Sequence, residues 1–275
     1  MGSGSYGILF RTSRTMRNIR LIARLDVKAP NLVKGVQLEG LRKLGDPNDF
    51  ALDYYHQGID EIYYEDIVAS LYERNSLLNI IEKTTEDIFV PITVGGGLRS
   101  IEDVTAVLRA GADKVSINTA AIKSPEVVSS VARRFGSQCM MLSIQAKRRG
   151  ESWEAYYDNG RERSGFDAVQ WAKKGECLGA GEIILTSVDR EGTTKGFDLD
   201  LIEAVTAEVS IPVIVSGGMG DLLDIDTAII EGGADAIAMA HVLHYRVYSV
   251  SDIREYCIQK GMPVRKLAIG GQKVA

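Results

Sequence analysis

Two glycine-rich runs of the same design stand far apart in the sequence. VPITVGGG at positions 90–97 recurs as IPVIVSGG at 211–218, an offset of 121 residues. Glycine lets a ligand approach the backbone closely, and the free amides of such a turn can hold a phosphate group. One glycine-rich turn is more often only a turn, but two copies in register predict a ligand that carries phosphate at both ends.

The flanks of the two runs repeat as well. GIDEI at 58–62 matches GAGEI at 179–183, and GAD occurs at both 111–113 and 233–235. A chain of two similar halves, each with short strands and amphipathic helices, can close into one barrel with two related ligand sites facing each other.

Eight short apolar runs predict buried strands, and helical patterns follow them. The runs cover 19–27, 61–67, 91–94, 114–117, 139–145, 182–187, 212–216 and 236–239. Residues 100–110 predict one of the helices, because apolar side chains recur there at helical spacing between a serine N-cap and Gly111. The alternation predicts an α/β protein folded as a single (β/α)8 TIM barrel of two similar half-barrels.

The carboxyl ends of the strands should carry the function, because long loops there usually do. Two connections, 28–45 and 146–164, exceed the usual loop length, and 153–160 within the second predicts a small hairpin that turns at Asp-Asn-Gly. The two cradles should lie at the same end. They comprise Gly96, Gly97, Asn118 and Thr119 on one side, and Gly196, Ser216, Gly217 and Gly218 on the other.

The composition excludes several other classes of protein. The chain has 275 residues, 45% hydrophobic and 25% charged, and a net charge of −5, which gives no reason to expect nucleic acid. Three cysteines without CxxC spacing predict neither disulfides nor zinc and favour a cytoplasmic location. No run is long enough to span a membrane. We expect a tag or disordered extension at 1–15, the barrel at 16–264 and a tail at 265–275.

Five motifs together resemble one family. They are LDVK at 25–28, VKGV at 33–36, TVGGGLRS at 93–100, AGADKVSIN at 110–118 and DREGT at 189–193. The family is the cyclase subunit of imidazole glycerol phosphate synthase, the barrel partner of a class I glutamine amidotransferase. The resemblance implies a bisphosphorylated substrate, no cofactor or metal, and a role in histidine biosynthesis. It also implies ammonia that enters from a glutaminase docked at the N-terminal face of the barrel.

The resemblance places two catalytic positions, one of them altered. Family members use an aspartate at the end of strand one and another at the end of strand five as general base and acid. Asp26 fills the first position, but Gln145 stands at the second, within otherwise intact flanks. A primary amide can orient a ligand but cannot replace a general acid. Lys34 is expected to contact substrate from the loop after strand one.

Two further positions depart from the family pattern. Arg24 stands where the family has a small residue or cysteine, and its side chain should share a face with Asp26. An Arg24–Asp26 pair would lower the pKa of the carboxyl and weaken it as a base, although Arg24 could instead bind an anionic ligand group. His241 replaces a small hydroxyl residue near the second phosphate. With His244 it suggests a metal site, but two histidines without carboxylates are more often structural.

A set of charged residues begins four of the predicted strands. They are Arg20, Glu61, Lys114 and Glu182. The resemblance makes them a ring that gates ammonia, whereas a salt-bridged plug is the simpler explanation. By the same resemblance, Asp113 belongs to the glutaminase-docking surface.

Three functions remain open at this point. The first is the cyclase itself, which converts a ribulosyl formimino aminoimidazole carboxamide ribotide and ammonia to imidazole glycerol phosphate and the carboxamide nucleotide. The second is a paralogue that conducts ammonia to a sugar amidotransferase in cell-surface glycan synthesis, which Gln145 and Arg24 favour. The third, a phosphate-binding isomerase, does not account for the charged ring.

Overall fold

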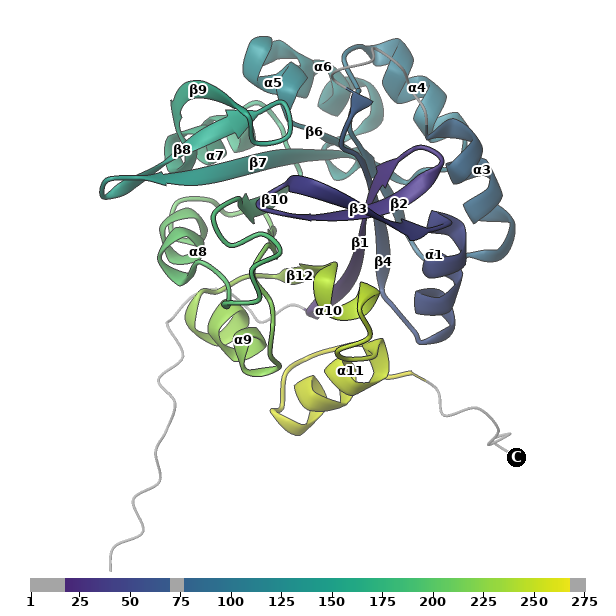
Figure 1. The fold of residues 1–275 in the computed structure, drawn as a ribbon. Helices are drawn as coiled ribbons and strands as arrows, with labels where there is room; N and C mark the ends of the chain where they lie inside the picture. The colour runs from purple at the N-terminus through teal and green to yellow at the C-terminus, as the bar shows by residue number, and fades with distance from the viewer. Residues whose placement is uncertain (1–17, 70–76, 268–275) are drawn as a thin grey trace, which may run out of the picture.

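The computed structural model describes residues 18–69 and 77–267, and its centre is a closed barrel of eight parallel strands (Figure 1). Around the barrel these are β1 (Arg20–Lys28), β4 (Glu61–Asp66), β5 (Ile92–Gly95), β6 (Lys114–Ile117), β7 (Met140–Arg149), β10 (Glu182–Ser187), β11 (Val213–Ser216) and β12 (Ala236–Met239). β12 pairs with β1, which closes the barrel. The predicted (β/α)8 fold is confirmed, and each predicted strand overlaps an observed one.

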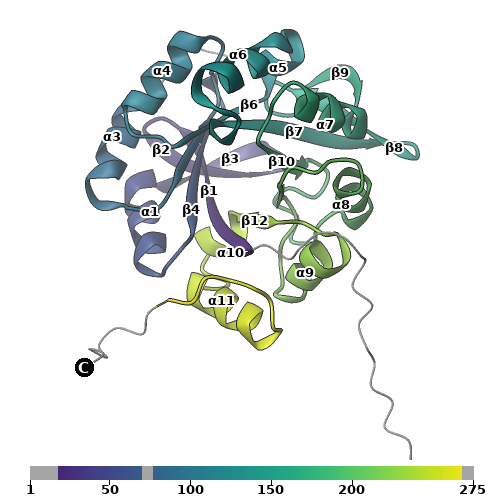
Figure 2. The same cartoon turned by 180° about the vertical axis from the view of Figure 1, so that it is seen from behind.

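Helices surround the barrel on its outside (Figures 1 and 2). They are α1 (Pro47–His56), α3 (Leu78–Asp87), α4 (Ile101–Arg109), α5 (Thr119–Lys123), α6 (Glu126–Phe135), α7 (Ala168–Cys177), α8 (Leu199–Thr206), α9 (Leu223–Asp226), α10 (His241–His244) and α11 (Val250–Gln259). The helix predicted at 100–110 is α4. Ser100 and Asp103 form a capping box at its start, which typically contributes about 1 kcal/mol.

Side chains alternate between the two faces of each barrel strand. On β1, Leu21, Ala23 and Leu25 pack outward in the core shared with the helices, whereas Ile22 points inward. A small inner cluster fills the middle of the barrel with Ile22, Tyr63, Met141, Ile184, Ile214, Ala236 and Ala238. This packed layer therefore separates the polar side chains that point inward at one end of the barrel from those at the other end.

Both long connections contain β-hairpins rather than irregular loops. β1 is followed by β2 (Asn31–Val36) and β3 (Glu39–Gly45), and β7 continues four residues beyond Gln145 to pair with β8 (Ser152–Tyr157) and then β9 (Glu162–Asp167). The hairpin predicted at 153–160 is confirmed as β8–β9. The reading of 28–45 as a loop was wrong, because its backbone groups pair between β2 and β3.

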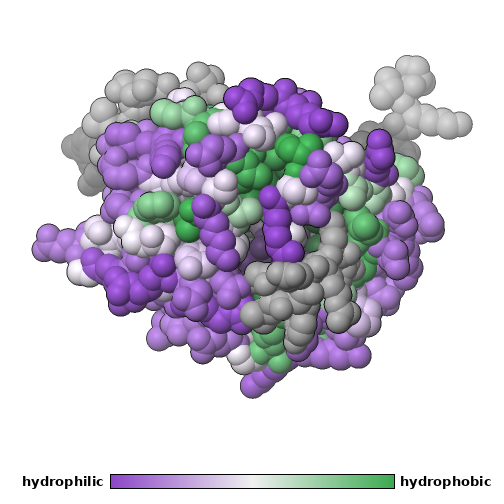
Figure 3. Space-filling model, turned by 90° about the horizontal axis from the view of Figure 1, so that it is seen from above, coloured by the Kyte–Doolittle hydropathy of each residue, from purple (hydrophilic) through white to green (hydrophobic). Residues whose placement is uncertain are grey.

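The surface differs from the core as expected of a globular domain. Figure 3 shows a face on which hydrophilic side chains predominate, with smaller apolar patches between them. Within the described residues, no helix is long and apolar enough to cross a membrane. The predicted extension at 1–15 and residues 268–275 of the predicted tail lie outside the described residues, so the domain limits remain a prediction.

Candidate functional site

Asp26 lies at the carboxyl end of β1, buried beneath the β2–β3 hairpin. Lys34 on β2 reaches down toward it, with its Nζ 3.6 Å from Asp26 Oδ2, and also contacts Glu191 in the loop after β10. The tip of the hairpin is tied to the same loop, because the Gln37 amide donates to the Glu191 carbonyl at 2.8 Å. The hairpin therefore covers the barrel mouth and brings Lys34 to Asp26.

The predicted Arg24–Asp26 pair is confirmed. Arg24 Nε donates to Asp26 Oδ1 at 2.9 Å, and its Nη1 donates to Thr186 Oγ1 at 3.0 Å and Ser216 Oγ at 3.1 Å. Burial acts to raise the pKa of Asp26, but the positive charges of Arg24 and Lys34 outweigh it and hold that pKa below its ordinary value. Asp26 is thus an ionised carboxylate and a weakened base.

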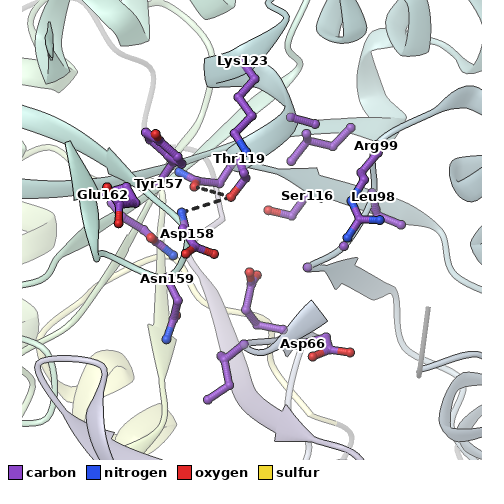
Figure 4. A pocket seen from close by; sticks show the side chains of 18 of the residues that line it. Asp66, Leu98, Arg99, Ser116, Thr119, Lys123, Tyr157, Asp158, Asn159 and Glu162 are labelled. Atoms are coloured by element: carbon purple, nitrogen blue, oxygen red, sulfur yellow. Dashed lines mark hydrogen bonds between the residues drawn. The ribbon is translucent and has the colours of Figure 1, made fainter. Parts of the chain in front are cut away.

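A cavity of about 540 Å³ opens at the carboxyl ends of β4 to β7 (Figure 4). Glu65, the β4 neighbour of Asp26, lines it, whereas Arg24 and Asp26 do not. Its floor includes Glu65, Ser116 and Gln145, and its rim carries the basic side chains of Arg99 and Lys123. The predicted first cradle lines the same cavity, with Gly96, Gly97, Asn118 and Thr119. The structure therefore brings the altered catalytic position and the first cradle into one space.

Two side chains of the first cradle hold its walls together. Asn118 Nδ2 donates at 3.0 Å to the carbonyls of Ser143 and Tyr156, and Thr119 Oγ1 accepts from the Asp158 amide at 3.1 Å (Figure 4). These bonds join the start of α5 to β7 and to the β8–β9 hairpin. Phosphate contact at this cradle would accordingly depend on backbone amides and on the basic rim.

The second cradle has the same backbone but far less room. Gly217 and Gly218 have φ of 91° and 117°, as Gly96 and Gly97 have φ of 87° and 74°, so both halves use left-handed double-glycine turns. The space lined by Ser216, Gly217, Gly218 and His241 is only about 20 Å³, enough for roughly one water molecule. The Gly196 amide lies alongside and donates to the Gly218 carbonyl at 2.9 Å. The space beside the second cradle is therefore much smaller than the cavity at the first.

The two histidines of α10 have different surroundings. His244 is buried and its Nδ1 lies 2.7 Å from the Tyr54 hydroxyl, while burial lowers its pKa to about 3. It is a neutral packing residue. His241 faces the second cradle. Among the residues that the structure describes, no group of three or more His, Cys, Asp or Glu side chains could hold a metal ion.

Glu65 is a candidate site residue that the sequence motifs do not predict. It is 7% exposed, contacts the Tyr63 hydroxyl and lines the cavity, and burial raises its pKa to about 8. The sequence does contain a feature that indicates this site. Glu61, Tyr63 and Glu65 occupy alternate positions of β4, and alternate residues of a barrel strand point inward.

The opposite end of the barrel carries the four predicted charged residues in one closed ring. Arg20 binds Glu61 at 3.0 Å and Glu182 at 2.8 Å, and Lys114 Nζ lies 2.8 Å from Glu61 and 2.9 Å from Glu182. Each acid thus bridges both bases. The ring closes the amino ends of the strands, on the far side of the inner apolar cluster from the cavity.

Asp113 has a local structural role at this same end. Its Oδ2 accepts from the Ile92 amide at 2.8 Å, and Asp235 does the same for Val213 at 2.9 Å in the second half of the chain. Asp60 likewise accepts from Leu21 at 2.9 Å. Contact of Asp113 with a partner therefore remains a prediction, in addition to this capping role.

Fold and site together define a (β/α)8 barrel with a ligand cavity at the carboxyl ends of its strands and a charged ring at the amino ends. The family described as histidine biosynthesis protein matches residues 20–249. A protein of Legionella pneumophila named imidazole glycerol phosphate synthase subunit HisF is 62% identical over 208 residues, which cover 75% of this chain and 98% of the relative.

Relatives from a second organism span more of the chain. Two proteins with the same name, from two strains of Dehalococcoides mccartyi, are each 46% identical over 250 residues, which cover 91% of this chain and 99% of each relative. The chain belongs to the HisF family of histidine biosynthesis proteins.

Proposed function

We propose that this chain is the ammonia-using cyclase subunit of a glutamine amidotransferase of the imidazole glycerol phosphate synthase type. Its reaction joins ammonia to the ribulosyl formimino aminoimidazole carboxamide ribotide and releases imidazole glycerol phosphate and the carboxamide nucleotide. The observation that carries the proposal is the pairing of two polar sites in one barrel, a ligand cavity at one end and a closed ring at the other. A phosphate-binding isomerase has no use for the ring.

Asp26 would accept a proton from the substrate, since it stays ionised between Arg24 and Lys34. Its lowered pKa makes proton acceptance less favourable than for an unpaired carboxylate. Backbone amides of Gly96 and Gly97, with Arg99 and Lys123, would hold one phosphate at the cavity rim. The second phosphate would need the Lys34–Glu191 contact and the hairpin above it to shift, because the space near Gly217 is small.

Ammonia would enter through the charged ring from a glutaminase at the amino ends of the strands. The ring of Arg20, Glu61, Lys114 and Glu182 must open to admit it, because its four salt bridges close that end. Above the ring, β4 points Glu61, Tyr63 and Glu65 inward in succession, and Tyr63 belongs to the packed inner layer, so ammonia would have to pass between the side chains of that layer to reach the cavity floor.

A second candidate function is an ammonia conduit that serves a sugar amidotransferase in cell-surface glycan synthesis. The specific observation in its favour is the pair of buried groups at the reaction centre, namely the amide of Gln145 and the Arg24 guanidinium on Asp26. An amide cannot donate a proton at neutral pH, and the guanidinium weakens the remaining base.

The two functions predict different behaviour of the isolated barrel. With ammonium chloride and the ribotide, a cyclase forms imidazole glycerol phosphate in proportion to the barrel added, even where turnover is slow. A conduit forms none above the barrel-free background, at any ammonium concentration. A barrel inactive in this assay that still stimulates a glutaminase would replace the first proposal by the second.

A further inference from the structure

Glu65 occupies a central place on the inside of the barrel mouth. In the β1–β4 register it lies directly beside Asp26, and alternate positions of β4 place it two residues beyond Tyr63. Glu65 and Gln145 line the same cavity from β4 and β7, and they are 7% and 2% exposed. The cavity floor therefore combines a carboxyl and an amide from two separate strands.

The carboxyl of Glu65 is hydrogen-bonded to a neutral partner. The Tyr63 hydroxyl donates to it and also lies 3.2 Å from Ser116 Oγ. Within residues 18–69 and 77–267, no lysine, arginine or histidine lies within salt-bridge distance of Glu65. Asp26, its neighbour, is held by two cations instead.

The charges that face Glu65 come from two strands. Arg24 and Asp26 on β1 and Asp66 on its own strand act on it, while β5 offers Gly95, β6 offers Ser116 and β7 offers the uncharged Gln145. Burial raises the pKa of Glu65 to about 8, Arg24 acts against this rise, and the two aspartates add to it. Glu65 can thus carry or release a proton near neutral pH, whereas the lowered pKa of Asp26 keeps that carboxylate ionised and the amide of Gln145 does not titrate.

Gln145 shows which ligand group belongs beside Glu65. Its Oε1 is buried and has no hydrogen-bond partner in the described part of the chain. A buried carbonyl oxygen without a donor is costly, by roughly 1–3 kcal/mol, so the position calls for an N–H or O–H from a ligand. Gln145 lines a cavity that is large enough to hold such a ligand group.

We propose that Glu65 and Gln145 form a subsite for a nitrogen-bearing ligand group, in which Gln145 accepts an N–H and Glu65 exchanges a proton with the nitrogen. The inference rests on the proposed function and adds a catalytic residue to it. As the bond from the formimino carbon to the leaving amine breaks, its electron pair stays on that nitrogen, which takes the proton of Glu65. The attacking nitrogen, now bonded to the same carbon, gives up a proton that restores Glu65.

Calorimetric titration with imidazole glycerol phosphate between pH 7 and pH 9 tests the subsite. Only protonated Glu65 can donate to the ligand, and its ionised form repels the phosphate-bearing ligand. We expect affinity of the unaltered barrel to fall about tenfold across this range, because the binding-competent fraction falls by that factor. Glu65→Gln, which keeps a donor without a charge, should retain most of the affinity seen at pH 7.

Two further variants separate this effect from the ligand's own titration and from misfolding. Glu151→Gln, in the turn between β7 and β8, makes the same charge change outside the cavity and should keep the tenfold fall. Glu65→Asp should keep a pH-dependent affinity with a shifted midpoint. In the ammonium-dependent reaction, Glu65→Gln should lower kcat by roughly 10²-fold or more.

The titration distinguishes failure of the Glu65 subsite from failure of the proposed cyclase function. An equal fall of affinity in the unaltered barrel and in Glu65→Gln would overturn the role of Glu65 and leave the cyclase proposal standing. Absence of binding by the unaltered barrel at every pH would contradict the proposed function itself, and the subsite with it. A fall confined to the barrels that keep a carboxyl at position 65 supports the subsite.

Discussion

Arg24 Nε lies 2.9 Å from Asp26 Oδ1, and both side chains are almost fully buried inside the barrel mouth. The guanidinium also holds Thr186 and Ser216, so it joins β1 to β10 and β11 across the interior. A pair so placed affects both stability and chemistry, because the same contact that orders the barrel mouth lowers the pKa of the carboxylate available as a base.

Removing the arginine should destabilise the barrel. Arg24→Met leaves Asp26 buried with one cation at 3.6 Å, and breaking a buried ion pair typically costs about 3–5 kcal/mol of the free energy of unfolding. Denaturant unfolding of Arg24→Met, Asp26→Asn and the double variant at pH 7 measures the coupling. Additive effects of the two substitutions would contradict the pair.

The same pair predicts a pH dependence of stability. The pKa of Asp26 is lower in the folded than in the unfolded chain, so its contribution is present above the unfolded value of about 3.9 and is lost as pH falls through the folded value. Between pH 6 and pH 3, the unaltered barrel should lose more stability than Asp26→Asn. Parallel unfolding curves over that range would show that Asp26 is not held ionised.

Restoring a carboxyl at position 145 should increase cyclisation. Gln145→Asp supplies a group that can donate a proton at the cavity floor, and general acid catalysis typically contributes about 10²- to 10⁴-fold. We expect a rise in kcat of the ammonium-dependent reaction that stays below that range, because the proposed donor Glu65 already lines the same cavity floor. Gln145→Glu is the matched control. It introduces the same charge as Gln145→Asp, but its carboxyl lies one methylene further from the backbone. An unchanged kcat in Gln145→Asp would show that position 145 is not where the reaction needs an acid.

The second cradle is tested by adding bulk and charge to one of its glycines. A side chain on Gly217 would meet the Ser187 carbonyl at 2.8 Å and Glu191 at 3.0 Å, and Gly217→Asp adds a charge of the same sign as phosphate. Bisphosphate affinity measured by calorimetry should fall at least tenfold. Gly150→Asp, in an open turn with φ of 60° and no neighbour within 4 Å, controls for backbone strain. Equal affinity in both variants would remove the second cradle.

A substitution at Asp113 can test docking of the glutaminase without removing the hydrogen bond to the Ile92 amide. Asp113→Asn keeps an oxygen that can accept from the Ile92 amide and removes only the charge. Binding to the glutaminase subunit should weaken by about tenfold, or 1.4 kcal/mol, without loss of stability. Asp235→Asn, at the equivalent capping position, should leave glutaminase affinity unchanged. Loss of affinity in both variants would indicate a general charge effect rather than a docking contact.

The elements of the barrel were predictable because each strand is a short apolar run bounded by turn residues. The alternation of side chains was enough to place Arg24 and Asp26 on one face. The same alternation predicts that Glu65 points inward. Its burial and the lack of a cation within salt-bridge distance among the described residues, which distinguish it from an ordinary acid at a strand end, are visible only in the structure. Side-chain periodicity predicts which face of a strand a side chain points to, but it does not predict how deeply that side chain is buried.

Two other features depend on long-range contacts that no local pattern contains. The β2–β3 hairpin lies over the barrel mouth because Lys34 and Gln37 bind the loop around Glu191, more than 150 residues away in sequence. The two cradles share backbone geometry, yet the volume beside Gly217 is set by side chains packed around it. Repetition in sequence predicted two related sites, but it does not predict how much space the surrounding side chains leave at each.

The most direct measurement follows the nitrogen atom. The unaltered barrel is incubated with ¹⁵N-ammonium and the ribotide, and the products are analysed by mass spectrometry. We expect one ¹⁵N atom in the ring of imidazole glycerol phosphate and an equimolar amount of unlabelled carboxamide nucleotide, both in proportion to the barrel added. Unchanged ribotide, with no labelled product above the barrel-free background even for Gln145→Asp, would contradict the assignment of this chain as an ammonia-using cyclase.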